Sequence, residues 1–175
     1  MKVVILQYRG LSIVSKMIQA ITWSRYSHSA IGNTSTGWVG ETWEKGGSSI
    51  EASPWANHTP NTPIDIYTLQ TDTNDQHNKI WQATFHLATI DAPYDYLSLL
   101  GFLPILRHFW QDKPNSFFCS HAVAHCCRVA NCLLFSPTTP LYKISPGLLP
   151  WSPRLSFKVT VKNNDEWDTF LEQYQ

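Results

Sequence analysis

The sequence has little charge and no excess of either sign. Lys and Arg number 13, Asp and Glu also number 13, and charged residues make up only 15% of the 175 residues. Because the charges balance, no net field recruits nucleic acid or an anionic surface, and we expect no nucleic-acid partner. The 13% aromatic content, with eight Trp, excludes a disordered chain. This length favours one domain over residues 1–175 with a substantial core.

Long apolar runs are also missing. The apolar run near the N-terminus is too short for a signal-peptide core, and no small-residue cleavage site follows it. The run at residues 97–106 is interrupted by Gly101 and Pro104 and is too short to span a bilayer, so we interpret it as core or pocket lining. We therefore expect no signal peptide, no transmembrane segment and, by default, a cytoplasmic protein. The oligomeric state stays open.

Cysteine is scarce, and all four cysteines lie between residues 119 and 132. Within one helix they would pair poorly, and no paired CxxC motif is present, so we expect reduced, mostly buried thiols. His121 and His125 have the spacing of a metal pair, with Cys126 nearby. Arg128 shares their face and no fourth ligand is placed, so we favour a solvated helix face. We predict neither a metal nor another cofactor.

The segment at residues 117–132 carries the most reactive side chain. Helical spacing places Cys119 at the head of an apolar stripe, and Asn115 and Ser116 just upstream are good helix caps. A cysteine in the first turn lies near unpaired N–H groups and the positive end of the helix dipole, which favour a thiolate. Cys119 is therefore a candidate nucleophile. The alternative is that it serves only as a small buried apolar residue.

The remaining pattern predicts a mixed chain with an antiparallel sheet packed against the cysteine helix. Turn residues at 33–37 join two strands as a hairpin, so His28 and Glu41 are expected to be near neighbours. The Pro-rich loop at 54–63 could overhang a site there. We expect strands at residues 3–8, 27–32, 38–43, 49–52, 64–69 and 155–161, and helices at 11–22, from a cap at 71–75 to about 90, at 117–132 and at 167–174.

Nucleophilic catalysis by a thiol needs an imidazole to take its proton and a polar group to hold the imidazole. Cys119, His28 and Glu41 fit these roles, as in papain-like folds. Glu44 and Glu51 could replace Glu41, but Glu44 lies at a turn and Glu51 on a different strand. His28 precedes Cys119, which reverses the papain order and implies a circular permutation. The other histidines, His58, His77, His86 and His108, have no motif context, and we interpret them as loop, surface or core residues.

Several motifs together resemble the permuted NlpC/P60 group of papain-like enzymes, which includes the YiiX/YebB-like proteins. They span roughly residues 4–161, and their order and spacing are more specific than any one of them. The matching segments are WSRYSHSAI at 23–31, VGE at 39–41, APYDY at 92–96, FCS at 118–120 and SPGL at 145–148. Two positions depart from the family pattern: His121 stands where Glu is usual, and Ala92 with Pro93 replaces the commoner small residues.

The resemblance implies an α+β, circularly permuted papain-like fold with Cys119 as nucleophile, His28 as base and Glu41 as the orienting residue. The implied activity is a cysteine hydrolase of peptidase or amidase type, or an acyl-transfer enzyme. It would act through an acyl-Cys intermediate on a peptide, a cell-wall component or an acylated small substrate. The Cys119 backbone N–H, Tyr26, Ser27 and Ser120 are candidates for oxyanion or substrate contacts. The alternative is a catalytically silent module that binds a peptide, glycan or lipid in the same groove.

Overall fold

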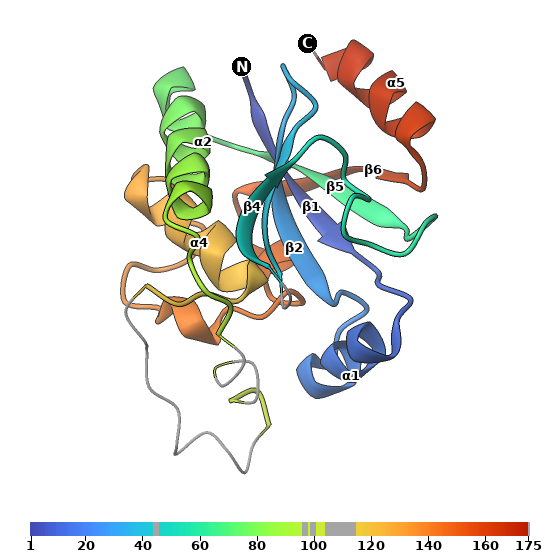
Figure 1. Ribbon diagram of the computed structural model, residues 1–175. Helices are drawn as coiled ribbons and strands as arrows, with labels where there is room; N and C mark the ends of the chain where they lie inside the picture. Colours follow the sequence, from blue (N-terminus) through green and yellow to red (C-terminus); the bar gives the residue numbers. More distant parts are fainter. Residues whose placement is uncertain (44–45, 96–97, 99–100, 104–114, 175) are drawn as a thin grey trace.

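A six-stranded antiparallel sheet organises the computed structural model, which describes residues 1–43, 46–95, 98, 101–103 and 115–174 (Figure 1). The strand order is β4-β3-β2-β1-β5-β6, and all neighbouring strands are antiparallel. The strands are β1 (Val3–Tyr8), β2 (His28–Asn33), β3 (Val39–Trp43), β4 (Gly47–Glu51), β5 (Ile64–Leu69) and β6 (Leu155–Val161).

The central strand β1 is buried on both faces. All of its residues are buried, which is why the sequence shows a continuous apolar run instead of an alternation. Ile5 contributes to the core on one face of the sheet, whereas Leu6 contributes to the core on the other. The sheet is therefore the middle layer of the described structure.

Helices cover both faces of this sheet (Figure 1). α2 (Asn74–Thr89) and α4 (Cys119–Val129) pack on one face, where Ile80 and Val123 meet Ile5 and Ile31. α5 (Asn164–Tyr174) packs on the other face through Trp167 and Phe170. The other helical segments are α1 (Ile13–Thr22) and the short 3-10 helices η2 (Leu141–Lys143) and η3 (Leu149–Trp151). The expected mixed α and β architecture with an antiparallel sheet is confirmed.

A glycine in β3 allows the helix layer to approach the sheet closely. A Cβ atom at Gly40 would lie 2.0 Å from the Cγ2 atom of Thr84 in α2. Thr84 is itself buried, and its hydroxyl donates to the Ile80 carbonyl one turn earlier. The absence of a side chain at Gly40 therefore sets the distance between α2 and the strand that carries Glu41.

Two predictions about the cysteine helix are wrong. The N-cap is Phe118 rather than Asn115 or Ser116, and no side chain among the described residues caps the helix. Phe118 is extended and completely buried, so apolar packing rather than a polar cap accompanies the helix start. His121 is not on a solvated face: it is only 4% exposed, beside Phe117 and Phe118. Burial lowers the pKa of His121 to about 4, so this imidazole is neutral at pH 7.

Some sequence predictions fall outside the described residues. Most of the run at 97–106 does, together with Glu44 and His108. In the described part of the chain, none of the helices has the length and apolar character needed to cross a bilayer.

Candidate active site

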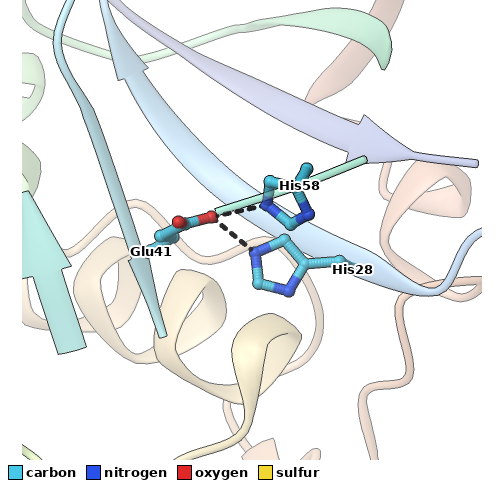
Figure 2. Close-up of side chains that lie close together, drawn as sticks. All are labelled: His28, Glu41 and His58. Carbon is cyan, nitrogen blue, oxygen red and sulfur yellow. Dashed lines mark hydrogen bonds and ion pairs between the residues drawn. The ribbon is translucent and has the colours of Figure 1, made fainter. Parts of the chain in front are cut away.

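His28 and Glu41 meet on one face of the sheet, as the hairpin predicts (Figure 2). His28 is the first residue of β2, and Glu41 in β3 pairs with Ala30, two residues further along the same face. The Nε2 atom of His28 lies 3.0 Å from Oε2 of Glu41, and both residues are buried. The β2-β3 register thus holds an imidazole against a carboxylate away from solvent.

Cys119 approaches the same imidazole from α4. It is the first residue of α4, which packs against β2 and β3, and it is 1% exposed. Its side chain lies close enough to His28 to favour the charged form of that imidazole. Because Nε2 of His28 is paired with Glu41, Nδ1 is the ring nitrogen left for the sulfur. Burial alone would lower the pKa of His28, but the Cys119 and Glu41 side chains outweigh it and raise the pKa to about 10.

The loop between β4 and β5 supplies two further partners of Glu41. His58 Nε2 lies 2.8 Å from Glu41 Oε2 (Figure 2). Asn57 Nδ2 donates to the other carboxylate oxygen, Oε1, at 2.9 Å. Burial would raise the pKa of Glu41, but the hydrogen bonds with His28 and His58 hold it well below its usual range. This carboxylate is therefore ionised. Glu51, the described alternative, pairs with Val39, the first residue of β3.

Tyr8 packs against both imidazoles. It is paired with His28 across β1 and β2, and its ring centroid is 5.0 Å from that of His28 and 4.2 Å from that of His58. The hydroxyl is buried and has no hydrogen-bond partner among the described residues. Burial and the Glu41 charge raise the pKa of Tyr8, so the hydroxyl stays protonated.

The three further candidates for oxyanion or substrate contacts make hydrogen bonds of their own. The Tyr26 hydroxyl donates to Asp65 Oδ2 at 2.6 Å. Ser27 Oγ accepts from the Gly10 N–H, and Ser120 Oγ donates to the Ile144 carbonyl. These hydroxyls are therefore engaged in holding the chain around the cluster.

A groove of about 230 Å³ opens beside His28. Part of its lining comes from α1 and the two residues before it, and includes the apolar side chains of Leu11, Val14 and Ile18. Another part is polar and includes the loop residues from Asn57 to Thr59. The groove therefore offers both apolar and hydrogen-bonding groups to a ligand.

The same cluster has the donor atoms of a metal site. One ligand atom each from His28, Glu41 and His58 lies within 4.8 Å of the others, and this is the one such cluster in the described part of the chain. His121 and His125, which the sequence offered as a metal pair, do not belong to it.

His58 and Asn57 are the site residues that the sequence analysis did not identify. His58 has no motif around it, and a loop residue cannot be placed by periodicity. The available signal was the loop itself, because residues 54–63 were expected to overhang a site, and there they contact Glu41.

The described chain is thus an α+β protein with a buried Cys–His–Glu cluster. A solved structure from Escherichia coli O157:H7, described as the metalloprotein yiiX, DUF1105, has a similar fold with a TM-score of 0.63. The two are 19% identical in sequence, and the alignment covers 91% of this chain and 97% of the other. No protein-family model matches the chain, and no curated protein matches its sequence. The chain therefore has a YiiX-like fold.

Proposed function

We propose that this protein is a cysteine hydrolase or acyltransferase with a circularly permuted papain-like fold. The observation that carries the proposal is the position of His28, which pairs with the Glu41 carboxylate on β3 and lies near Cys119 at the start of α4. A thiol, an imidazole and an acid in this order form the set that activates a cysteine nucleophile. The His28 pKa of about 10 favours an imidazolium that stabilises the thiolate.

In this mechanism, the Cys119 sulfur attacks a carbonyl carbon and forms a C–S bond. The oxygen becomes an oxyanion that accepts a hydrogen bond from the Cys119 backbone N–H, which has no acceptor inside α4 because it lies in the first turn. The bond between the carbonyl carbon and the leaving nitrogen or oxygen then breaks, and the His28 imidazolium donates its proton to that leaving atom. Neutral His28 then takes a proton from water or an acceptor hydroxyl, which attacks the acyl-Cys and releases Cys119.

The mixed lining of the groove supports an amphipathic acyl donor as substrate. Leu11, Val14 and Ile18 provide apolar lining, whereas Asn57 and Thr59 provide hydrogen-bonding groups in the same groove. A substrate with an apolar acyl or side-chain portion next to an amide or ester bond fits this division. Peptides, cell-wall fragments and acyl esters with such a portion are the candidates.

Alkylation by iodoacetamide tests the proposal without a known substrate. A free cysteine thiol has a pKa of about 8.5. In the wild type, modification of Cys119 should stay fast well below that pH. His28→Ala should move the pH profile towards that of a free thiol, and Cys119→Ala should abolish the labelling. Mass spectrometry of the modified peptide measures the rate at each pH.

Cys126→Ala is the matched control, because Cys126 lies on the same helix, is buried and has its pKa raised by that burial to about 12. This variant should keep the wild-type labelling profile. Superimposable profiles near pH 8.5 in the wild type and His28→Ala would overturn the hydrolase proposal in favour of a binding module.

A further inference from the structure

One oxygen of Glu41 is shared by two imidazoles. His28 Nε2 lies 3.0 Å and His58 Nε2 2.8 Å from Oε2, while Asn57 holds Oε1 at 2.9 Å. Orienting the base of a Cys–His pair requires one carboxylate and one imidazole. The cysteine mechanism therefore gives no role to His58, although His58 is held as closely as His28.

We propose that His28, Glu41 and His58 form a binding site for a divalent metal ion of the zinc class. Two imidazole nitrogens and one carboxylate oxygen are an established zinc donor set with an open fourth position. Ligand atoms about 2.0 to 2.1 Å from a tetrahedral ion lie about 3.3 Å apart. The two observed separations are shorter than this value by about half an ångström or less, and all three donor atoms lie within 4.8 Å of one another. Small side-chain movements would suffice to admit the ion.

The surroundings fit an ion and its fourth ligand. The groove of about 230 Å³ is lined by both His28 and His58, so it provides an entry path and room for a water molecule. Asn57 donates to the Glu41 oxygen that the imidazoles do not share, which is the way that outer partners orient a ligating carboxylate. The Tyr8 hydroxyl, buried and unpaired among the described residues, adds a polar group next to both rings.

Metal binding and cysteine catalysis would exclude each other at this site. The Nε2 atom of His28 binds either a proton that it donates to Glu41 or a metal ion, but not both. A bound ion thus replaces the hydrogen bond between His28 and Glu41 that the catalytic arrangement needs. This consequence rests on the proposed function, whereas the binding site itself does not. The ion would act as a reversible inhibitor of the cysteine chemistry.

Direct binding of zinc to the full-length protein tests the site. Calorimetry and metal analysis after dialysis should give one zinc ion per chain for the wild type. His58→Ala should weaken binding by at least about tenfold, because losing a ligand costs no less than losing an outer partner. His86→Ala is the matched control, since His86 is an exposed histidine on α2, and it should bind like the wild type. Absence of binding, or equal binding by the wild type and His58→Ala, would overturn the site.

Cobalt separates this site from binding by thiols and from the cysteine mechanism. The Co²⁺-loaded wild type should lack the intense thiolate-to-cobalt charge-transfer band, and Cys119→Ala should bind Co²⁺ with the same spectrum. A strong charge-transfer band that disappears in Cys119→Ala would assign the ion to the sulfur instead. Cys119→Ala cannot form an acyl enzyme. Metal binding by this variant therefore tests the metal site independently of the proposed hydrolase activity.

The inhibitory consequence has its own readout. Zinc should slow iodoacetamide labelling of Cys119 in the wild type, and a chelator should restore it. Whatever its own rate without zinc, His58→Ala should show a much smaller ratio between its labelling rates without and with zinc than the wild type. Equal slowing of both proteins by zinc would overturn the exclusion of catalysis by the bound ion.

Discussion

His28 is the residue on which the proposed chemistry depends, because its ring lies near both Cys119 on α4 and Glu41 on β3. It pairs with Glu41 on β3, and the nearby Cys119 side chain on α4 raises its pKa. Both neighbours favour the charged ring, and together they overcome burial, which opposes the charge. The imidazolium therefore owes its stability to two separate elements, and each contribution can be removed separately.

Glu41→Gln removes the charge at the outer side of His28. The amide keeps one acceptor oxygen but replaces the other with a donor, although Glu41 accepts hydrogen bonds at both oxygens. We expect Cys119 alkylation near neutral pH to slow by about tenfold, which corresponds to one pKa unit on His28. The effect should be smaller than that of His28→Ala.

The measurement for Glu41→Gln is the same iodoacetamide profile, with Glu51→Gln as the control at the end of β4. A profile identical to that of the wild type would mean that Glu41 does not support the imidazolium.

The buried hydroxyl of Tyr8 leads to a prediction about folding stability. Its hydroxyl is buried without a partner among the described residues, and a buried unpaired hydroxyl costs folding free energy. Tyr8→Phe keeps the ring against His28 and His58, so the metal-free protein should be as stable as the wild type or more stable, by up to about 1 kcal/mol. Urea unfolding in the presence of a chelator measures this. A loss of more than about 1 kcal/mol would show that the hydroxyl is bonded in solution.

At the scale of elements, the side chain of Trp55 anchors the loop between β4 and β5 to the sheet. Trp55 packs against the core that contains Leu6 and Val39, and its indole N–H donates to the Thr62 carbonyl. This internal hydrogen bond closes the loop on itself between residues 55 and 62. The loop can therefore hold Asn57 and His58 against Glu41 although it has no regular secondary structure.

The contact between α2 and β3 can be tested by adding one methyl group. Gly40→Ala places a Cβ atom on the Cγ2 atom of Thr84, so the variant should lose about 1 to 3 kcal/mol of stability through overpacking. Thr84→Ser removes that Cγ2 atom and keeps the hydroxyl that donates to Ile80. The double variant should recover most of the loss, and urea unfolding of all four proteins gives the coupling energy. If the stability losses of Gly40→Ala and Thr84→Ser simply add in the double variant, α2 moves away from β3 and the two side chains do not clash.

The elements that carry the site could be predicted from sequence because each has a local signal. The apolar run at residues 3–8 predicted β1, and the turn at 33–37 brought His28 to Glu41. Cys119 was expected in the first turn of its helix and begins α4. All four cysteines are free and buried, as expected.

The missed features depend on tertiary packing, which leaves no periodic signal. His121 was placed on the polar face by helical spacing, but the aromatic rings of Phe117 and Phe118 enclose it. The start of α4 accompanies the burial of Phe118, while the polar residues before it do not cap the helix. His58 reaches Glu41 only because a loop folds back over the sheet. Such long-range contacts cannot be deduced from the residue types alone.

At the scale of the whole molecule, one buried carboxylate joins several strands at the end of the sheet. Asp65 in β5 accepts hydrogen bonds from Arg9 beyond β1, from Tyr26 before β2 and from Thr160 in β6. Its side chain is completely buried, whereas that of Arg9 is 34% exposed. The network ties the segment that leads into His28 to three other strands, so it supports the site without touching it.

This network makes a prediction about acid stability. Burial would raise the pKa of Asp65, but hydrogen bonds from Thr160, Tyr26 and Arg9 lower it below its usual value. The folded protein thus binds the proton less readily than the unfolded chain. The stability from Asp65 is present above the unfolded pKa of about 3.9 and is lost as the pH falls through the lower folded pKa.

Asp65→Asn should therefore cost about 3 kcal/mol at pH 7, because it removes a buried charge from Arg9 and replaces one acceptor with a donor. The loss should shrink as the pH falls below about 4, where the wild type loses the same contribution. Urea unfolding between pH 7 and the lowest pH at which both proteins fold measures the difference. Asp72→Asn is the matched control: Asp72 is an exposed carboxylate paired with Arg154, and its loss should change stability little. A difference between Asp65→Asn and the wild type that stays constant down to low pH would show that hydrogen-bond geometry, and not the charge of Asp65, stabilises this end of the sheet.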